Sequence, residues 1–517
     1  LAALSGVLLA AAYPGSNQGY LAWFALVPLM LLAFRPRGKR AMAGLFAAFG
    51  AGLNLVLLYW FLAMHPLTWL GFTVTQSLGI VIFAWLGASA ALTVQFALLG
   101  FVYGYVTQRW ETPDWRHVLS LALGWTALEW LTSLGPFGFT WDNLALTQVH
   151  YLPLIQVLNL VGPFPLAGLI IGVNGALALA IRRQFGKPFA LANWQPLGAA
   201  LFPVACVAAY GLVQVSRPLP DTTFSVEIVQ GNIAGSEKFA HGPGALEREA
   251  DKYFTLTDQH KDAELVIWPE TSMPTYVRSM PAQWLYSRLM RTANQENRTL
   301  LIGTLDWSGF PPNPQHLYNA VTAFAPRVGN LGFDYKRHLV PFGEYVPGRD
   351  LLPAGLMKAA GLMNILGEDF TPGVVPHIFT MPFGNVGTGV CYDGIFPDEM
   401  RKPVLAGAQI LALVTNDAWY KDTTAPRVLN AHAVLRAVEN DRWVLRAANT
   451  GISSIIDPHG NIVAETPVFK DETLVGRAAP MDGLTLYTRF GNWAPMLALL
   501  GFLAFLVSRW TLRKTAA

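Results

Sequence analysis

The sequence predicts a membrane domain of eight helices and, between the seventh and the eighth, a layered α/β domain in water. Three observations support this fold class. Only 13% of the 517 residues are charged and 53% are apolar, whereas soluble domains average about 25% charged residues. Residues 1–216 hold long apolar segments with only nine Lys or Arg and four Asp or Glu. Beyond them, short β-rich runs alternate with helical patterns, so one chain serves two physical environments.

The apolar segments define the membrane domain. A helix needs about 20 apolar residues to cross roughly 30 Å of hydrocarbon. Eight segments approach this length, at 1–13, 19–34, 41–63, 78–107, 117–133, 152–181, 197–215 and 492–508. Residues 1–216 are therefore expected to form helices 1–7, and residues 491–517 the eighth helix with a cytoplasmic tail.

Basic residues in the loops give the orientation. With a cytoplasmic N-terminus, Lys and Arg fall in the inside loops, at 35–40, 108–116, 182–187 and after Ser508. The predicted outside loops hold no Lys or Arg, at 14–18, 64–77 and 134–151. This pattern follows the positive-inside rule, and the buried helices of a large soluble protein would not sort charge in this way. Residues 217–490 are therefore expected outside the cytoplasm.

Residues 217–490 have the pattern of a soluble α/β domain. Runs such as Phe224–Val229 and Ile410–Val414 alternate with helical stretches at 245–260 and 425–439. Strands that alternate with helices favour a layered α/β fold over a barrel of hairpins. Fold class alone does not give the chemistry, which must come from a site.

Three reactive side chains occur where β-rich runs meet turns. Glu270 follows Leu265–Pro269, Lys336 follows Tyr335, and Cys391 ends a Gly-rich run. Catalytic groups often gather at the carboxyl ends of strands in α/β sheets. A thiol needs a base or cation for activation, a carboxylate in an apolar pocket can take its proton, and an ammonium can stabilise an oxyanion. These residue types predict Cys391 as a nucleophile assisted by Glu270 and Lys336.

Cysteine and charge patterns exclude other classes of function. Cys206 and Cys391, the two cysteines, have no neighbours at metal or redox spacing, so zinc and thioredoxin chemistry are unsupported. Cys206 lies within an apolar segment and is expected to serve packing. The net charge of +3 is too small and dispersed for nucleic-acid binding. No metal or cofactor is expected.

Longer motifs resemble the nitrilase superfamily and, more closely, the apolipoprotein N-acyltransferases of bacterial envelopes. The matching motifs are Val229-Gln-Gly-Asn-Ile233, Trp268-Pro-Glu-Thr271, Lys336 with His338-Leu-Val-Pro-Phe-Gly-Glu344, Cys391-Tyr392, Thr415-Asn-Asp-Ala-Trp419 and Asn449-Thr-Gly451. The resemblance covers essentially the whole chain. It implies that residues 217–490 form an α-β-β-α nitrilase-like sandwich between the seventh and eighth helices.

The resemblance also implies roles for single residues. Glu270 acts as general base and acid, Lys336 stabilises the intermediate, and Cys391 is the nucleophile. The implied substrate-binding residues are Glu344, Tyr392, Asp393, Trp419 and Phe239. The chain departs from the family pattern with Asp393 in place of a frequent Glu, Phe239 in place of a frequent Trp, and Lys421–Thr424 in place of a Gly-rich segment.

The implied reaction transfers an acyl chain in two steps. Cys391 takes the chain from a phospholipid as a thioester, and the α-amine of a diacylglyceryl-modified apolipoprotein then accepts it, which gives ping-pong kinetics. Both substrates are anchored in lipid, so the thiol must work just above the bilayer. The resemblance implies a monomeric multi-pass protein of the cell inner membrane, in contact with membrane lipids, with its catalytic domain on the periplasmic or extracytoplasmic side.

Two other functions remain open from the sequence. A membrane-tethered amidase could use the same triad on small amides with water as acceptor, although one anchoring helix would then suffice. A non-catalytic lipoprotein-binding module is the second alternative, and the intact Glu, Lys and Cys count against it.

Further segments carry weaker expectations. The apolar stretch 351–370 is expected either to form a lid that touches lipid or to pack on its own domain. Glu129 lies inside a membrane segment, and we expect it either to take part in function or to form a hydrogen bond between helices. The loop Gly138–Gln148 could line a path for lipid. His338 and His432 are expected to be structural.

Overall fold

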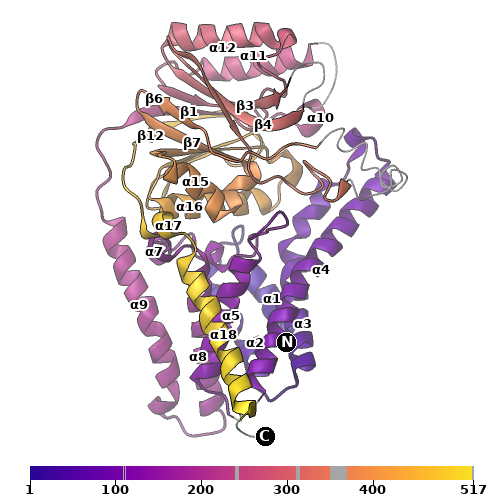
Figure 1. Ribbon diagram of the computed structural model, residues 1–517, viewed down its shortest axis with the longest axis vertical. Helices are drawn as coiled ribbons and strands as arrows, with labels where there is room; N and C mark the ends of the chain where they lie inside the picture. The colour runs from indigo at the N-terminus through magenta and orange to yellow at the C-terminus, as the bar shows by residue number, and fades with distance from the viewer. Residues whose placement is uncertain (109, 111, 239–243, 310–314, 350–368, 515–517) are drawn as a thin grey trace.

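The computed structural model describes residues 1–108, 110, 112–238, 244–309, 315–349 and 369–514. A bundle of helices forms one end of the molecule, and two β-sheets with their covering helices are stacked on it (Figure 1). We refer to residues 1–215 as the helical region and to residues 224–478 as the α/β region.

Helices precede the first strand. They are α1 (Ala2–Ala10), α2 (Val27–Ala33), α3 (Lys39–Leu57), α4 (Val74–Thr107), α5 (Trp115–Leu131), α6 (Leu152–Ile155), α7 (Leu158–Val161), α8 (Phe164–Gln184) and α9 (Gln195–Val215). Helix α18 (Trp493–Lys514) follows the last strand and returns along the bundle beside α5 (Figure 1).

Within the described residues, four helical stretches are long and apolar enough to cross a membrane. They are Lys39–Met64, Val74–Thr107, Phe164–Gln184 and Leu191–Val215, and shorter apolar helices cover Gly19–Ala33, Leu152–Val161 and Trp493–Ser508. The helical region therefore has the features of a membrane protein. The predicted number of eight crossings stays a prediction.

One predicted helix, at 152–181, is interrupted, so the expectation of a continuous helix there is wrong. Gly162 adopts a φ of 76° between α7 and α8, a conformation that glycine reaches without steric cost. Pro163 follows at the N-cap of α8, and proline disfavours helical geometry in the residue before it. A side chain at position 162 would also collide with the ring of Tyr487, 2.6 Å away.

The α/β region contains two six-stranded sheets. The first has the order β12-β1-β2-β3-β4-β5 and the second β11-β10-β9-β8-β7-β6. The strands are β1 (Phe224–Gln230), β2 (Leu265–Ile267), β3 (Thr299–Ser308), β4 (His316–Ala325), β5 (Gly329–Tyr335), β6 (Ile378–Met381), β7 (Gly384–Val390), β8 (Ile410–Thr415), β9 (Val444–Ala448), β10 (Ser454–Ile456), β11 (Ile462–Glu465) and β12 (Glu472–Ala478). Parallel pairs β1–β2–β3 and β7–β8–β9 form their centres.

Buried side chains divide the α/β region into layers. Val226, Leu301, Val386 and Val414 belong to one apolar cluster between the sheets. Helices α11 (Ala245–Thr257) and α12 (Gln283–Glu296) cover the first sheet, and α15 (Pro397–Leu405) and α16 (Ala425–Asn440) cover the second (Figure 1). The cluster beneath α15 and α16 continues into the helical region, so the two regions share one core.

Candidate active site

Glu270 lies in a strained turn after β2. Thr271 has a φ of 45°, which is uncommon for a residue other than glycine and often marks a functional turn. The turn packs on Gly303 of β3, where any side chain would meet the Pro269 carbonyl oxygen at 2.3 Å. The Glu270 carboxylate is buried, and its Oε2 accepts a 2.8 Å hydrogen bond from the Asn416 N–H.

Lys336 directly follows β5 and is buried. Its Nζ lies 2.8 Å from Glu344 Oε1 and 3.3 Å from Glu270 Oε1. Glu344 is fixed through its other oxygen, which accepts a 2.8 Å hydrogen bond from the Val340 N–H. The structure thus brings the ammonium group against two carboxylates that are separated by 74 positions in the chain.

Asn319 on β4 completes this arrangement and was not among the residues expected from the sequence. Its Nδ2 donates to Glu270 Oε1 at 2.8 Å and to Glu344 Oε1 at 3.0 Å. The same two oxygens contact Lys336, so the amide fixes both carboxylates around the ammonium group. A single asparagine within a strand belongs to no motif and does not change the pattern of apolar residues, so the sequence contains no signal for it.

Cys391 occupies the sharp turn at the end of β7. Its φ is 49°, and its side chain is half-buried. A short 3₁₀ turn, Cys391–Ile395, begins at this residue. Phe342, between Lys336 and Glu344, also has a positive φ, of 61°. Strained turns therefore occur near Glu270, Lys336 and Cys391, which is typical of functional sites.

Burial and neighbouring charges set the protonation of these groups. Burial, followed by the charge of Glu270, raises the pKa of the Cys391 thiol above its ordinary value, while Lys336 lowers it. Burial lowers the pKa of Lys336, but Glu270 and Glu344 outweigh that effect, so it lies well above its ordinary value. The resting site therefore pairs a neutral thiol with a permanently charged ammonium group, and the thiol needs a base to react.

Asp393 and Tyr392 follow the thiol but point elsewhere. The Asp393 carboxylate is fully buried and accepts hydrogen bonds from the N–H groups of His338 at 2.7 Å and Val390 at 2.9 Å. The Tyr392 hydroxyl donates to the Gly138 carbonyl at 3.1 Å. Asp393 thus binds backbone groups of its own domain, and Tyr392 contacts the helical region.

An aromatic cluster joins the site to the helical region. Tyr420 packs edge-on against Trp60 with ring centroids 5.0 Å apart, and Trp419 lies 5.0 Å from Trp69. Trp60 also packs on Trp141, at 5.0 Å. Burial raises the pKa of Tyr420, and the nearby Cys391 group raises it further. The cluster therefore extends from the end of the helices to the surroundings of the thiol.

The loop between α5 and α6 forms the rest of this contact. The Thr140 hydroxyl donates to the Ile395 carbonyl at 2.8 Å. Glu129 anchors the loop, because its Oε1 accepts from the Trp125 indole at 3.1 Å and from the Leu144 N–H at 3.2 Å. The loop expected to line a lipid path thus lies directly against the turn that starts at Cys391.

The remaining candidate residues lie apart from the triad or outside the described residues. The His338 ring stacks on Phe396 at 3.7 Å, and burial lowers the pKa of His338 to about 4, so the ring is neutral. Burial also lowers the pKa of His432. Phe239, expected to bind substrate, and nearly all of the apolar stretch 351–370 lie outside the described residues.

The arrangement is suited to nucleophilic catalysis. It offers a thiol, a carboxylate able to accept its proton, and an ammonium group able to stabilise negative charge on a tetrahedral intermediate. Among the described residues, no group of three or more His, Cys, Asp or Glu side chains is placed to hold a metal ion.

Comparison with known proteins gives matches over both regions. Residues 5–176 match the model of the apolipoprotein N-acyltransferase N-terminal domain, and residues 228–480 match that of carbon-nitrogen hydrolases. The apolipoprotein N-acyltransferase of Geobacter metallireducens is 32% identical, over 96% of this chain and 92% of that protein. That of Nostoc sp. is 31% identical, over 94% of each. Among solved structures, Saccharomyces cerevisiae Nit3 is 21% identical over 50% of this chain and 90% of its own, with a TM-score of 0.37.

Proposed function

The chain belongs to the apolipoprotein N-acyltransferases, and from this premise we propose that Cys391 carries a phospholipid acyl chain as a thioester to the α-amine of a lipidated N-terminal cysteine. The chain is an acyltransferase with the membrane-protein features of its family. The identity of the donor, the acceptor and the catalytic residues is the proposal.

The position of the Cys391 turn carries this proposal. Tyr392 and Ile395, in the turn that begins at Cys391, form hydrogen bonds with Gly138 and Thr140 in the loop at the end of α5. The ester groups of phospholipids lie where the hydrocarbon core meets the headgroups, and membrane helices end at this depth. A thiol held against helix ends can therefore meet a lipid ester, whereas an amidase for small soluble amides gains nothing from such contacts.

The proposed reaction has two steps. Glu270 accepts the thiol proton as the Cys391 sulfur attacks the ester carbonyl, and Lys336 stabilises the oxyanion. The carbonyl re-forms, the lysophospholipid alcohol leaves, and Glu270 returns the proton to its oxygen. The acceptor amine then attacks the thioester, Glu270 takes a proton from the nitrogen, and the sulfur leaves as the free thiol. Charge and protons balance over the cycle.

The proposal includes a finer topology. We propose eight crossings, a membrane domain at residues 1–216, a catalytic α-β-β-α domain at 217–490 on the extracytoplasmic side of the inner membrane, and a final span at 491–517. The absence of Lys and Arg from the predicted outside loops supports this orientation. Helices α9 and α18 both extend from the side of the α/β region that faces the bundle (Figure 1).

Acyl-enzyme formation tests the catalytic proposal. Purified protein mixed with phosphatidylethanolamine vesicles should gain the mass of one long acyl chain, located on Cys391 by peptide mapping. A diacylglyceryl peptide with a free amine should then remove the adduct and gain the chain as an amide. Cys391→Ala should show neither step, with an unchanged melting temperature. Release of free fatty acid at the same rate with and without the peptide would instead indicate a hydrolase.

Topology is tested separately with single cysteines. In a Cys206→Ala, Cys391→Ala background, Lys470→Cys should react with a membrane-impermeant thiol reagent in intact cells whose outer barrier is permeabilised. Lys187→Cys should react only after lysis. The reverse pattern would overturn the proposed orientation.

A further inference from the structure

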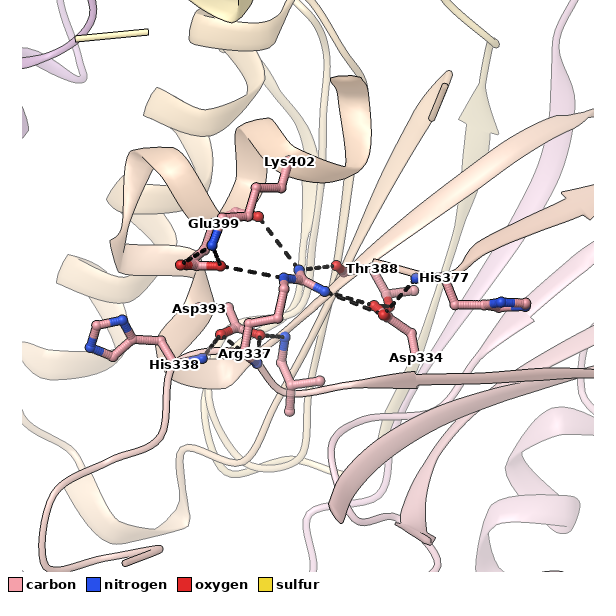
Figure 2. A network of polar contacts seen from close by, with 9 residues as sticks. Asp334, Arg337, His338, His377, Thr388, Asp393, Glu399 and Lys402 are labelled. Carbon is pink, nitrogen blue, oxygen red and sulfur yellow. Dashed lines mark hydrogen bonds and ion pairs between the residues drawn. The ribbon is translucent and has the colours of Figure 1, made fainter. Parts of the chain in front are cut away.

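A buried arginine lies directly beside Lys336 and belongs to no expected role. Arg337 is 7% exposed, and its guanidinium lies between Asp334, Thr388 and Glu399 (Figure 2). Lys336 contacts Glu270 and Glu344 while Arg337 contacts this separate set, so one short segment serves both the site and the network behind it.

The Arg337 side chain joins the two sheets. Its Nη1 lies 3.0 Å from Asp334 on β5 of the first sheet. Its Nη2 donates at 2.7 Å to the carbonyl of Thr388 on β7 of the second sheet, and its Nε lies 3.4 Å from Glu399 on α15. The Thr388 hydroxyl also donates to Asp334. Thr388 precedes Cys391 by three positions, so the guanidinium is bonded to the strand that carries the nucleophile.

The Arg337 backbone is held by the same strand end. Asp393 accepts hydrogen bonds from the N–H groups of Arg337 at 3.2 Å and His338 at 2.7 Å (Figure 2). It also accepts one from the Val390 N–H at 2.9 Å. Asp393 and Val390 flank Cys391 in the chain, while Arg337 and His338 directly follow Lys336. The segment of the ammonium group and the segment of the thiol are thus connected twice, through a side chain and through backbone.

Stability alone does not account for this network. Taking charges out of water is costly, and replacing a buried ion pair by apolar residues is often neutral or stabilising. A guanidinium offers five N–H donors in a rigid plane, so it fixes the relative positions of several acceptors at once. Fixed geometry matters most where two reactive groups come from different sheets, because a displacement of about 1 Å can slow a reaction roughly 100-fold.

We propose that Arg337 is a positioning residue that sets the distance between the Lys336 ammonium group and the Cys391 sulfur by fixing β5 to β7. It acts through these two residues and not on the substrate. The inference rests on the proposed function, because it assigns Arg337 to the same site.

Alkylation of Cys391 tests this role without requiring acyl transfer. With Cys206→Ala as the background, Cys391 is the single thiol, and its rate of reaction with iodoacetamide against pH reports the thiol pKa. Since Lys336 lowers that pKa, displacing the ammonium group should raise it. We expect Arg337→Met to shift the alkylation profile upward in pH and to slow acyl-enzyme formation roughly 10- to 100-fold, with little change in KM for lipid. Arg337→Lys keeps the charge but loses the planar contacts. Its alkylation profile and its rate of acyl-enzyme formation should lie between those of the wild type and Arg337→Met.

A matched control comes from the other buried arginine of the first sheet. Arg298 is 1% exposed and pairs with Glu227 on β1, at the amino ends of the parallel strands and away from Cys391. Arg298→Met should lower the melting temperature as Arg337→Met does, yet leave the alkylation profile and the rate per folded molecule unchanged.

The pH dependence of activity supplies a second measurement. Burial raises the pKa of Asp393 to about 6, Arg337 and Lys336 lower it, and Glu399 raises it. Loss of the Arg337 charge should therefore move the acid limb of the pH–rate profile to higher pH.

The outcomes separate this inference from the proposed function. If both Arg337 variants keep the wild-type alkylation profile and rate per folded molecule, the positioning role is wrong. If Arg337→Met does not fold, Arg337→Lys decides by the same measurements. A wild-type enzyme that forms no acyl adduct overturns the proposed function, while the alkylation profiles still decide the role of Arg337.

Discussion

The two ends of the first sheet bury charge in different ways. At the amino ends of its parallel strands, Arg298 pairs with Glu227 and donates to the carbonyls of Thr257 and His260, both at 3.1 Å. At the carboxyl ends, Lys336 contacts Glu270 and Glu344, and Asn319 contacts both carboxylates as well.

The difference shows which features accompany chemistry. Around Arg298 the partners lie on β1, at the end of α11 and in the segment that directly follows α11. Around Lys336 every partner lies on or beside a turn, two of these turns contain residues with positive φ, and Cys391, the proposed nucleophile, is close enough to influence the pKa of Lys336. Burial of charge alone therefore does not indicate a catalytic site. Several strained turns that converge on one charged side chain are the more typical feature of such a site.

Removing the shared charge should have the largest effect. Lys336→Met leaves Glu270 and Glu344 without their ammonium partner and removes the cation that lowers the pKa of Cys391. We expect acyl-enzyme formation in a single-turnover mass assay to slow by about 10³-fold or more, because an electrostatic stabiliser of the oxyanion is lost. Arg298→Met should keep its rate per folded molecule. A loss below tenfold for Lys336→Met would contradict the assigned role.

Replacing Asn319 should have the second largest effect on activity. Asn319→Leu has similar volume but cannot donate to either carboxylate, so Glu270 and Glu344 lose one orienting contact each. We expect kcat to fall about 10- to 100-fold while lipid KM stays unchanged. Asn330→Leu is the control, since Asn330 lies at the far end of β5 and donates to Thr322. Equal loss in both variants would show a general effect on the sheet.

The sequence predicted the kinds of element better than their continuity. Alternating strand and helix patterns predicted the layered α/β region because each layer buries one face of its strands. The break at Gly162-Pro163 was missed because the apolar run continues through it, and hydropathy does not register backbone conformation. The shared core beneath α16 could not be predicted either, because it joins Ile155 and Leu158 to Val428 across distant parts of the chain.

The site was predictable only where a reactive side chain followed a recognisable strand. Glu270, Lys336 and Cys391 meet that condition, and their roles stay predictions. Asn319 and Arg337 were missed because their importance lies in contacts across strands and sheets, which leave no local pattern. Asp393 was expected to bind substrate, but its position under three backbone N–H groups favours a positioning role.

The pH dependence of stability tests the charge pair at the amino end of the sheet, through Glu227. Burial raises the pKa of Glu227 from 4.5 to about 8, although Arg298 lowers it. Protonation of Glu227 therefore favours the folded state. Its contribution to the free energy of unfolding is complete below pH 4.5, the ordinary pKa, and is lost as the pH rises through about 8, the pKa in the folded protein. We expect the free energy of unfolding in detergent to fall by roughly 1–4 kcal/mol over this range. Glu227→Gln should remove most of that slope, and an unchanged slope would contradict the burial effect.

The smallest expected effect concerns the contact between the nucleophile turn and the helical region. Tyr392→Phe removes the hydrogen bond to Gly138 but keeps the ring packed edge-on against His338 and Phe396. One such bond contributes about 0.5–1.5 kcal/mol, so acyl-enzyme formation from vesicles should slow about two- to tenfold. Tyr345→Phe loses a similar bond, to Pro136 in the same loop, but does not follow the thiol. A loss in Tyr392→Phe alone would show that the turn, and not the domain contact in general, must be held against the helices. Equal losses would place the effect in docking of the two regions.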